Sequence, residues 1–177
     1  MVHGVGDTRP PLSVAVAHRA HLPNGADDIV DAAQPDVIFH LASPVDLRHG
    51  ADVHQQLQPG IVDATIAIAR AAVRQQARLV LVSSCAVYEG SEAPFAECGP
   101  LVPRSPYGQL KRAAEAAANE VENLSMCTVR PFRTYGPGCE TGLIADVCRA
   151  IATDSPIQLT DGRQVREWNH VSAIATG

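Results

Sequence analysis

Short apolar runs alternate with longer stretches of helical periodicity along most of this chain. The expected strands are 12–17 (LSVAVA), 36–41 (DVIFHL), 79–83 (LVLVS) and 126–130, with short candidates at 157–160 and 165–171. The expected helices are 24–33, 51–76, 106–122 and 143–153. Continuous apolar runs are typical of buried parallel strands, and their alternation with helices predicts an α/β fold with helices on both faces of a parallel sheet. Pro59-Gly60 predicts a kink or break in the second helix.

Length and charge narrow the classes of protein that fit this pattern. A chain of 177 residues with 19% charged and 46% hydrophobic residues is typical of one globular domain. The net charge of -5 and the lack of basic clusters exclude nucleic acid as an expected partner. The first residues have neither the cationic nor the apolar region of a signal peptide. We therefore expect a soluble, cytoplasmic protein without a membrane partner.

The cysteines and histidines give no metal or disulfide pattern. The five cysteines are odd in number and none is spaced as CxxC, so mostly buried, reduced thiols are expected. The paired histidines 18/21 and 49/54 have no acidic or thiol ligands at metal-site spacing. No metal site is predicted.

Tyr107 and Lys111 stand four residues apart, just after Pro106 begins a predicted helix. Positions four apart share a helix face, so both side chains are expected in one cleft at the carboxyl ends of the strands. A tyrosine titrates at about 10, and a nearby ammonium favours the phenolate. Ser84, after the preceding strand, can hydrogen-bond to the reacting oxygen. The three residues predict an acid/base site, although this spacing alone also fits a packed tyrosine beside a surface lysine.

Five sequence blocks surround these residues. They are DVIFHLAS at 36–43, LVLVSSCAVYEG at 79–90, SPYGQLKRAAE at 105–115, VRPFRTYGPG at 129–138 and, more weakly, DGRQVREWNHVSAIA at 161–175. In order and spacing they resemble the extended short-chain dehydrogenase/reductase family, in particular its NAD-dependent epimerase/dehydratase branch of sugar-nucleotide enzymes. The resemblance implies an incomplete Rossmann-like, doubly wound parallel sheet that lacks the usual first strand-helix-strand unit. It also implies a partial NAD-binding domain over 1–155 and the start of a substrate-binding region over 156–177.

The resemblance implies roles for individual residues as well. The positions that match the catalytic residues are Ser84, Tyr107 and Lys111. The positions implied to bind the cofactor are Leu41, Ala42, Ser43, Ser83, Tyr107, Lys111, Pro131 and Phe132. Substrate contacts are implied for Ser84, Arg133, where asparagine is frequent, and Arg166, which matches an arginine that meets the substrate phosphates. In such enzymes a transient hydride transfer to NAD creates a keto sugar.

Several positions depart from the family pattern. The early glycines Gly4, Gly6 and Gly25 do not form the GxxGxxG loop that binds pyrophosphate, and His3–Gly6 is expected to be a flexible terminus. His21 replaces an aspartate that contacts adenine. Cys85-Ala86 replaces the acidic pair of 4,6-dehydratases, which disfavours dehydration. Both ends are expected to be truncated relative to the family, and the missing loop puts the binding of NAD or NADP in doubt.

Three functional hypotheses follow. The first is an NAD(P)-dependent nucleotide-sugar epimerase or reductase that uses Ser84, Tyr107 and Lys111 for proton transfer. The second is a non-catalytic remnant that acts as a binding module or partner subunit. The third is cofactor-independent acid/base chemistry in the same cleft. The expected small-molecule partner is a nucleotide sugar, and the family commonly forms homodimers through two long helices, here 51–76 and 106–122.

The missing first strands have a consequence for the sheet. They would leave the edge of 36–41 unpaired, and unpaired edges are usually covered. We expect 12–17 to lie beside 36–41 after a right-handed crossover, and the alternative is edge pairing between two chains.

Overall fold

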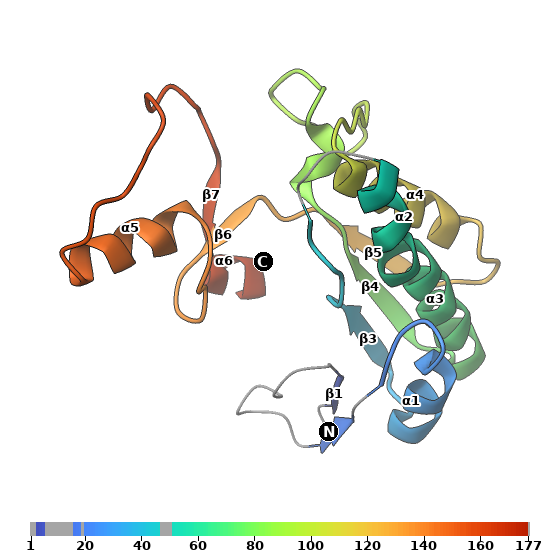
Figure 1. Cartoon of the computed structure of the whole chain (residues 1–177). Coiled ribbons are helices and arrows are strands. Elements are labelled where there is room, and N and C mark those ends of the chain that lie inside the picture. Colours follow the sequence, from blue (N-terminus) through green and yellow to red (C-terminus); the bar gives the residue numbers. More distant parts are fainter. Residues whose placement is uncertain (1–2, 6–15, 19, 47–50, 177) are drawn as a thin grey trace. The chain divides into compact units, whose positions relative to one another are not determined.

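The computed structural model describes residues 3–5, 16–18, 20–46 and 51–176 (Figure 1). The chain divides into two compact units, Met1–Arg130 and Pro131–Gly177. The strands are β1 (His3–Val5), β2 (Val16–His18), β3 (Val37–His40), β4 (Arg78–Val82), β5 (Met126–Val129), β6 (Arg133–Tyr135) and β7 (Trp168–His170). The helical elements are α1 (Ala26–Ala33), α2 (Ala51–Gln58), η1 (Pro59–Asp63), α3 (Ala64–Gln75), η2 (Cys85–Tyr88), α4 (Pro106–Asn119), α5 (Leu143–Ala152) and α6 (Val171–Thr176).

A three-stranded parallel sheet in the order β3-β4-β5 forms the centre of the first unit. Helices α2, α3 and α4 lie along one face of this sheet, and α1 packs on α3 (Figure 1). Leu79 and Leu81 of β4 point toward this covered face and are fully buried. On the opposite face, Val37 is 45% exposed and Phe39 is 65% exposed. The helical cover is therefore incomplete within the described part of this unit.

The long helix predicted over 51–76 is present, with a break at the predicted place. Pro59 begins a π-helical turn between α2 and α3, because proline has no N–H to donate to the helical ladder. Gly60 lies against Pro44, whose Cγ and Cδ atoms would be 2.8 Å from an added Cβ atom. The break thus lets the helix approach the loop that follows β3.

The core of the first unit has two apolar clusters. One lies between α2, η1 and α4, and its most buried large side chains are Ile61 and Leu110, each 1% exposed. The other joins α3 to β4 and includes Ile68 and Leu79. Each large apolar side chain contributes roughly 1.5–3 kcal/mol when fully buried. The first cluster also contains Tyr107, so the packing of α2 against α4 fixes the position of that ring.

The N-terminal strands differ from the sequence-based expectations. His3–Val5, expected to be flexible, forms β1 and pairs in parallel with Val16–His18 of β2. The run 12–17 is described only at its last two residues, and these pair with β1 in a separate sheet and not with β3. The predicted position beside β3 is wrong for these residues, because β1 already provides their backbone partners. Residues 12–15 lie outside the described residues, and edge pairing between two chains stays a prediction.

The second unit contains a small parallel sheet of β6 and β7. β6 lies in a segment that we expected to be a loop, and the ring of its Tyr135 meets His170 edge-on with centroids 5.3 Å apart. The strand predicted over 157–160 is not formed. The boundary between the two units falls between Arg130 and Pro131 in the sequence. By expected role, the sequence instead divides into a cofactor-binding part over 1–155 and a substrate-binding part over 156–177. That division stays a prediction.

The thiols are less buried than predicted. The five cysteines form no disulfide; Cys85 and Cys139 are half-buried and the other three are exposed, so the expectation of mostly buried thiols is wrong. Cys127 is exposed because it lies on the uncovered face of the β3-β4-β5 sheet. In the described part of the chain, no three histidine, cysteine or acidic side chains gather closely enough for a metal ion. The described helices are all too short or too polar to cross a bilayer.

Candidate active site

Helix α4 begins at a tightly fixed point. Ser105 caps the helix, since its Oγ atom accepts a hydrogen bond from the backbone N–H of Gly108 at 3.1 Å. The same hydroxyl donates to Glu89 Oε1 at 2.7 Å, while Glu89 Oε2 accepts from the backbone N–H groups of Arg104 and Ser105. Pro106 occupies the first helical turn, as the sequence predicts. This network fixes the backbone on either side of Tyr107.

Gly108 lets α4 approach η2 closely. A Cβ atom at this position would lie 2.6 Å from the backbone oxygen of Ala86, which is closer than real contacts allow. Ser84 immediately precedes η2 and caps it by accepting a hydrogen bond from the backbone N–H of Ala86 at 3.2 Å. The close approach therefore brings the end of β4 to the first turn of α4, where Tyr107 lies.

Tyr107 is buried and bonded to two hydroxyl groups. Its side chain is 8% exposed and forms hydrogen bonds with the side chains of Ser84 and Ser43. Burial raises the pKa of Tyr107, and the two hydrogen bonds act in the opposite direction. Tyr107 is thus a protonated phenol at neutral pH. It can donate a proton directly to an oxygen that lies near Ser84.

Lys111 lies one helical turn after Tyr107, on the same face of α4. Its ammonium group is 5.8 Å from the centre of the Tyr107 ring and donates a hydrogen bond to the backbone oxygen of Val82 at 3.1 Å. The residue is only 6% exposed. Burial lowers the pKa of Lys111 to about 8, while the charge of Glu115 acts to raise it. The structure therefore brings Ser84, Tyr107 and Lys111 together around the end of β4.

His40 belongs to the same site, although sequence reasoning did not select it. It is the last residue of β3 and is 6% exposed. Burial and the charge of Lys111 lower the pKa of His40 to about 4, so its imidazole is neutral at pH 7. The sequence feature that could have revealed His40 is its place inside the apolar run DVIFHL. Burying a polar side chain there is unfavourable unless another interaction compensates.

Residues at the ends of β3 and β4 give this site its open side. Leu41 is 65% exposed, Ala42 is exposed and Ser43 is half-buried. Ser83 is 5% exposed, and its Oγ atom has no hydrogen-bond partner among the described residues. Buried hydroxyl groups normally have a partner, so the Ser83 hydroxyl group is available to a bound molecule.

The remaining predicted site residues lie in the second unit. Pro131 and Phe132 are half-buried. Arg133 is exposed, and its guanidinium carbon lies 6.0 Å from the centre of the Trp168 ring. Arg166 is exposed, and its Nη1 atom donates to the neighbouring backbone oxygen of Val165 at 2.8 Å. The guanidinium group of Arg166 is therefore accessible to solvent.

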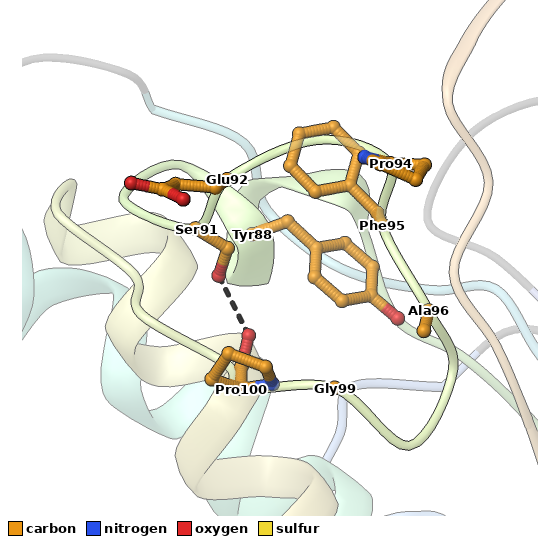
Figure 2. Close-up of a pocket in the computed structure, with 8 residues that line it drawn as sticks. All are labelled: Tyr88, Ser91, Glu92, Pro94, Phe95, Ala96, Gly99 and Pro100. Atoms are coloured by element: carbon orange, nitrogen blue, oxygen red, sulfur yellow. Dashed lines mark hydrogen bonds between the residues drawn. The ribbon is translucent and has the colours of Figure 1, made fainter.

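Two pockets lie outside the predicted residues. The first, of about 60 Å³, lies in the loop after η2, where the rings of Tyr88 and Phe95 stack 5.3 Å apart and Ser91 donates to the backbone oxygen of Pro100 at 2.6 Å (Figure 2). It has room for a few water molecules and not for a sugar. The second, of about 410 Å³, lies in the second unit between β6, α5 and Trp168.

Comparison with known proteins identifies the chain's relatives. The model of the NAD dependent epimerase/dehydratase family matches residues 15–177. UDP-glucose 4-epimerase of Mycolicibacterium smegmatis is 30% identical over 166 residues, which cover 83% of this chain and 53% of the relative. UDP-glucuronate 4-epimerase of Thermodesulfobacterium geofontis is 32% identical over 106 residues, 56% of this chain and 33% of the relative. The chain thus spans about half or less of these two relatives.

A solved structure agrees with these relationships. MoeE5 in complex with UDP-glucuronic acid and NAD superposes with a TM-score of 0.86 and 28% sequence identity, covering 99% of this chain and 61% of that one. The Rossmann-like α/β fold expected from the sequence is thereby confirmed. Together with the family match over most of its length, this shows that the chain belongs to the NAD dependent epimerase/dehydratase family.

Proposed function

We propose that this chain carries the acid/base site of an NAD(P)-dependent nucleotide-sugar epimerase or reductase. One observation carries the proposal: Tyr107 is hydrogen-bonded to Ser84, and the buried ammonium group of Lys111 lies one helical turn away. That arrangement joins a proton donor, a hydroxyl group that can hold an oxygen of the substrate, and a positive charge. The family of the chain makes a sugar hydroxyl the natural group to react there.

The side chains divide the chemistry between them. Ser84 holds the sugar oxygen against the Tyr107 hydroxyl group. When the sugar is oxidised, Tyr107 takes the hydroxyl proton as a phenolate, and it returns that proton when the keto group is reduced. Lys111 stabilises the phenolate by its positive charge. Tyr107 is protonated at neutral pH in the cofactor-free protein. It must therefore lose its proton before it can act as the base, and a low pH opposes that loss.

The residues at the open side of the site fit the nicotinamide half of a dinucleotide. The Ser83 hydroxyl group is buried and has no partner among the described residues, and Lys111 and Tyr107 lie at the same strand end. Ser83 and Lys111 would hold the ribose hydroxyls, and Leu41 and Ala42 would lie against the ring system. When bound, NAD supplies the hydride acceptor. Pro131 and Phe132 are proposed to flank the nicotinamide, and Arg133 and Arg166 to contact the sugar nucleotide.

Cys85-Ala86 makes epimerisation or reduction preferable to dehydration. Dehydration needs an acid and a base beyond the tyrosine, and the two residues after Ser84 supply a thiol and a methyl group. A second candidate is a non-catalytic binding subunit, which is supported by the spacing of Gly4, Gly6 and Gly25, since these glycines do not form a GxxGxxG motif. That candidate predicts the same fold without cofactor binding.

Calorimetric titration of the purified chain with NAD and with NADP distinguishes the two candidates. The proposal predicts binding of at least one dinucleotide at up to millimolar concentration and turnover of a UDP-sugar. In Tyr107→Phe, turnover is lost while dinucleotide binding and the circular dichroism spectrum are retained. Absence of binding at millimolar dinucleotide would eliminate the hydride-transfer proposal and favour the binding subunit. Full activity of Tyr107→Phe would show that the tyrosine has no acid/base role.

A further inference from the structure

An ion pair between the buried Glu115 of α4 and the half-buried Arg130 lies beside the candidate site. Glu115 is 3% exposed, and both of its carboxylate oxygens accept hydrogen bonds from Arg130, at 3.0 Å from Nε and 2.8 Å from Nη2. This two-bond geometry is the strongest form of carboxylate–guanidinium contact. The hydrogen bonds with Glu115 raise the pKa of Arg130. Glu115 and Arg130 therefore form a salt bridge, with the carboxylate on the more buried side.

Glu115 is also placed to act on the candidate site. Tyr107, Lys111 and Glu115 follow one another at four-residue intervals, so they form one row along α4. Glu115 favours the ammonium form of Lys111, whereas burial disfavours it. The other titratable groups near Lys111 are the neutral imidazole of His40 from β3 and the protonated phenol of Tyr107 from α4, and the thiol of Cys85 faces Tyr107. From β4, Lys111 meets the backbone oxygen of Val82.

Arg130 also forms hydrogen bonds with residues outside α4. Its Nη1 atom donates to the hydroxyl oxygen of Tyr88 at 2.7 Å and to the backbone oxygen of Glu97 at 2.9 Å. Arg130 directly follows β5. Its guanidinium group therefore links the end of this strand to α4 and to the loop shown in Figure 2. With these partners Arg130 is fixed in place and cannot turn away from Glu115.

We propose that Glu115, held by Arg130, is a positioning residue that keeps Lys111 in its charged form within the buried site. The inference rests on the proposed function for its effect on catalysis, but not for its effect on Lys111. A buried ammonium group without a nearby negative charge would lose its proton near neutral pH. An uncharged Lys111 could no longer stabilise the Tyr107 phenolate. Glu115 thus supplies the negative charge beside Lys111, and Arg130 holds Glu115 in place.

The chain is well suited to a direct test, because Lys111 is its only lysine. Lysine labelled with ¹³C at Cε gives a single side-chain NMR signal, whose pH titration reports the Lys111 pKa without any substrate or cofactor. In the unmodified chain the midpoint is expected at about 8. In Glu115→Gln the midpoint is expected to fall by about one pH unit or more, the usual effect of losing one close opposite charge. Glu120→Gln, which changes an exposed acid at the end of the same helix, is the control and leaves the midpoint unchanged.

A second variant guards against misfolding, since Glu115→Gln leaves the half-buried Arg130 without its counter-charge. Glu115→Gln/Arg130→Gln removes both charges and can retain an amide–amide hydrogen bond, and its Lys111 midpoint is also expected below that of the unmodified chain. An unchanged midpoint in the folded variants overturns the inference.

Catalysis provides a separate readout. If the proposed function holds, the alkaline limit of turnover moves to lower pH in Glu115→Gln together with the NMR midpoint, while Glu120→Gln keeps the original profile. If no dinucleotide binds, the proposed function fails, yet the NMR titration still decides the role of Glu115. The two failures are therefore distinguishable.

Discussion

Replacing Lys111 by methionine is expected to stabilise the folded chain at neutral pH. Burial lowers the pKa of Lys111 from 10.5 to about 8. Each pKa unit corresponds to about 1.4 kcal/mol, so keeping this ammonium group charged in the folded state costs about 3 kcal/mol. The lost hydrogen bond to the Val82 oxygen offsets about 1 kcal/mol of the gain. We therefore expect Lys111→Met to raise the free energy of unfolding by about 2 kcal/mol at pH 7.

The pH dependence identifies the cause. Between pH 8 and 10.5 the unfolded chain binds more protons than the folded chain, so the stability of the unmodified protein rises with pH through this window. From pH 7 to 9.5 the rise amounts to about 2 kcal/mol, and Lys111→Met lacks it. Urea unfolding of both proteins at several pH values in this range measures the difference. A stability difference that does not change with pH would refute a buried, charged Lys111.

Two further predictions concern residues around the same site. His40 has a pKa lowered to about 4 from 6.5, so the unfolded chain binds more protons in this range and stability falls as the pH drops from 6.5 to 4. His40→Gln should remove about 3 kcal/mol of this acid sensitivity in urea unfolding, and an unaltered slope would contradict the burial of a neutral imidazole. Gly108→Ala should lower the free energy of unfolding by about 1–3 kcal/mol, because its Cβ atom would meet the Ala86 oxygen at 2.6 Å. The exposed neighbouring change Gln109→Ala is the control, and equal effects of the two would show that α4 and η2 are not in tight contact.

Local sequence signals predicted the helices better than the strands. The start of α4 at Pro106 and the break at Pro59 follow from proline chemistry, which acts within one turn and is visible in any sequence. β6 was missed because it has three residues, begins with an exposed arginine and has no apolar alternation. The pairing of β2 with β1 was missed because His3–Val5 carries almost no strand signal by itself.

The candidate site was predictable only in part for the same reason. Tyr107 and Lys111 share a helix, so a spacing of four residues was enough to place them together. The contacts of Arg130 with Glu115 and Tyr88 join residues 15 and 42 positions apart, and no local pattern carries that information. The burial of His40 could have been suspected, but not its position beside Lys111, because that depends on how β3 and α4 pack.

Three energetically unfavourable groups lie at one end of the sheet: the buried ammonium of Lys111, the buried imidazole of His40, and the Ser83 hydroxyl, which has no hydrogen-bond partner among the described residues. A fold that only had to be stable would place apolar side chains at such positions. Apart from Lys111, all lysine or arginine positions of the chain are arginines. Arginine is effectively never deprotonated in proteins, whereas a buried lysine can titrate near neutral pH. Lys111 thus stands where the proposed mechanism requires a positive charge beside Tyr107. The presence of three such unfavourable groups in one place favours an acid/base site over a purely structural role for α4.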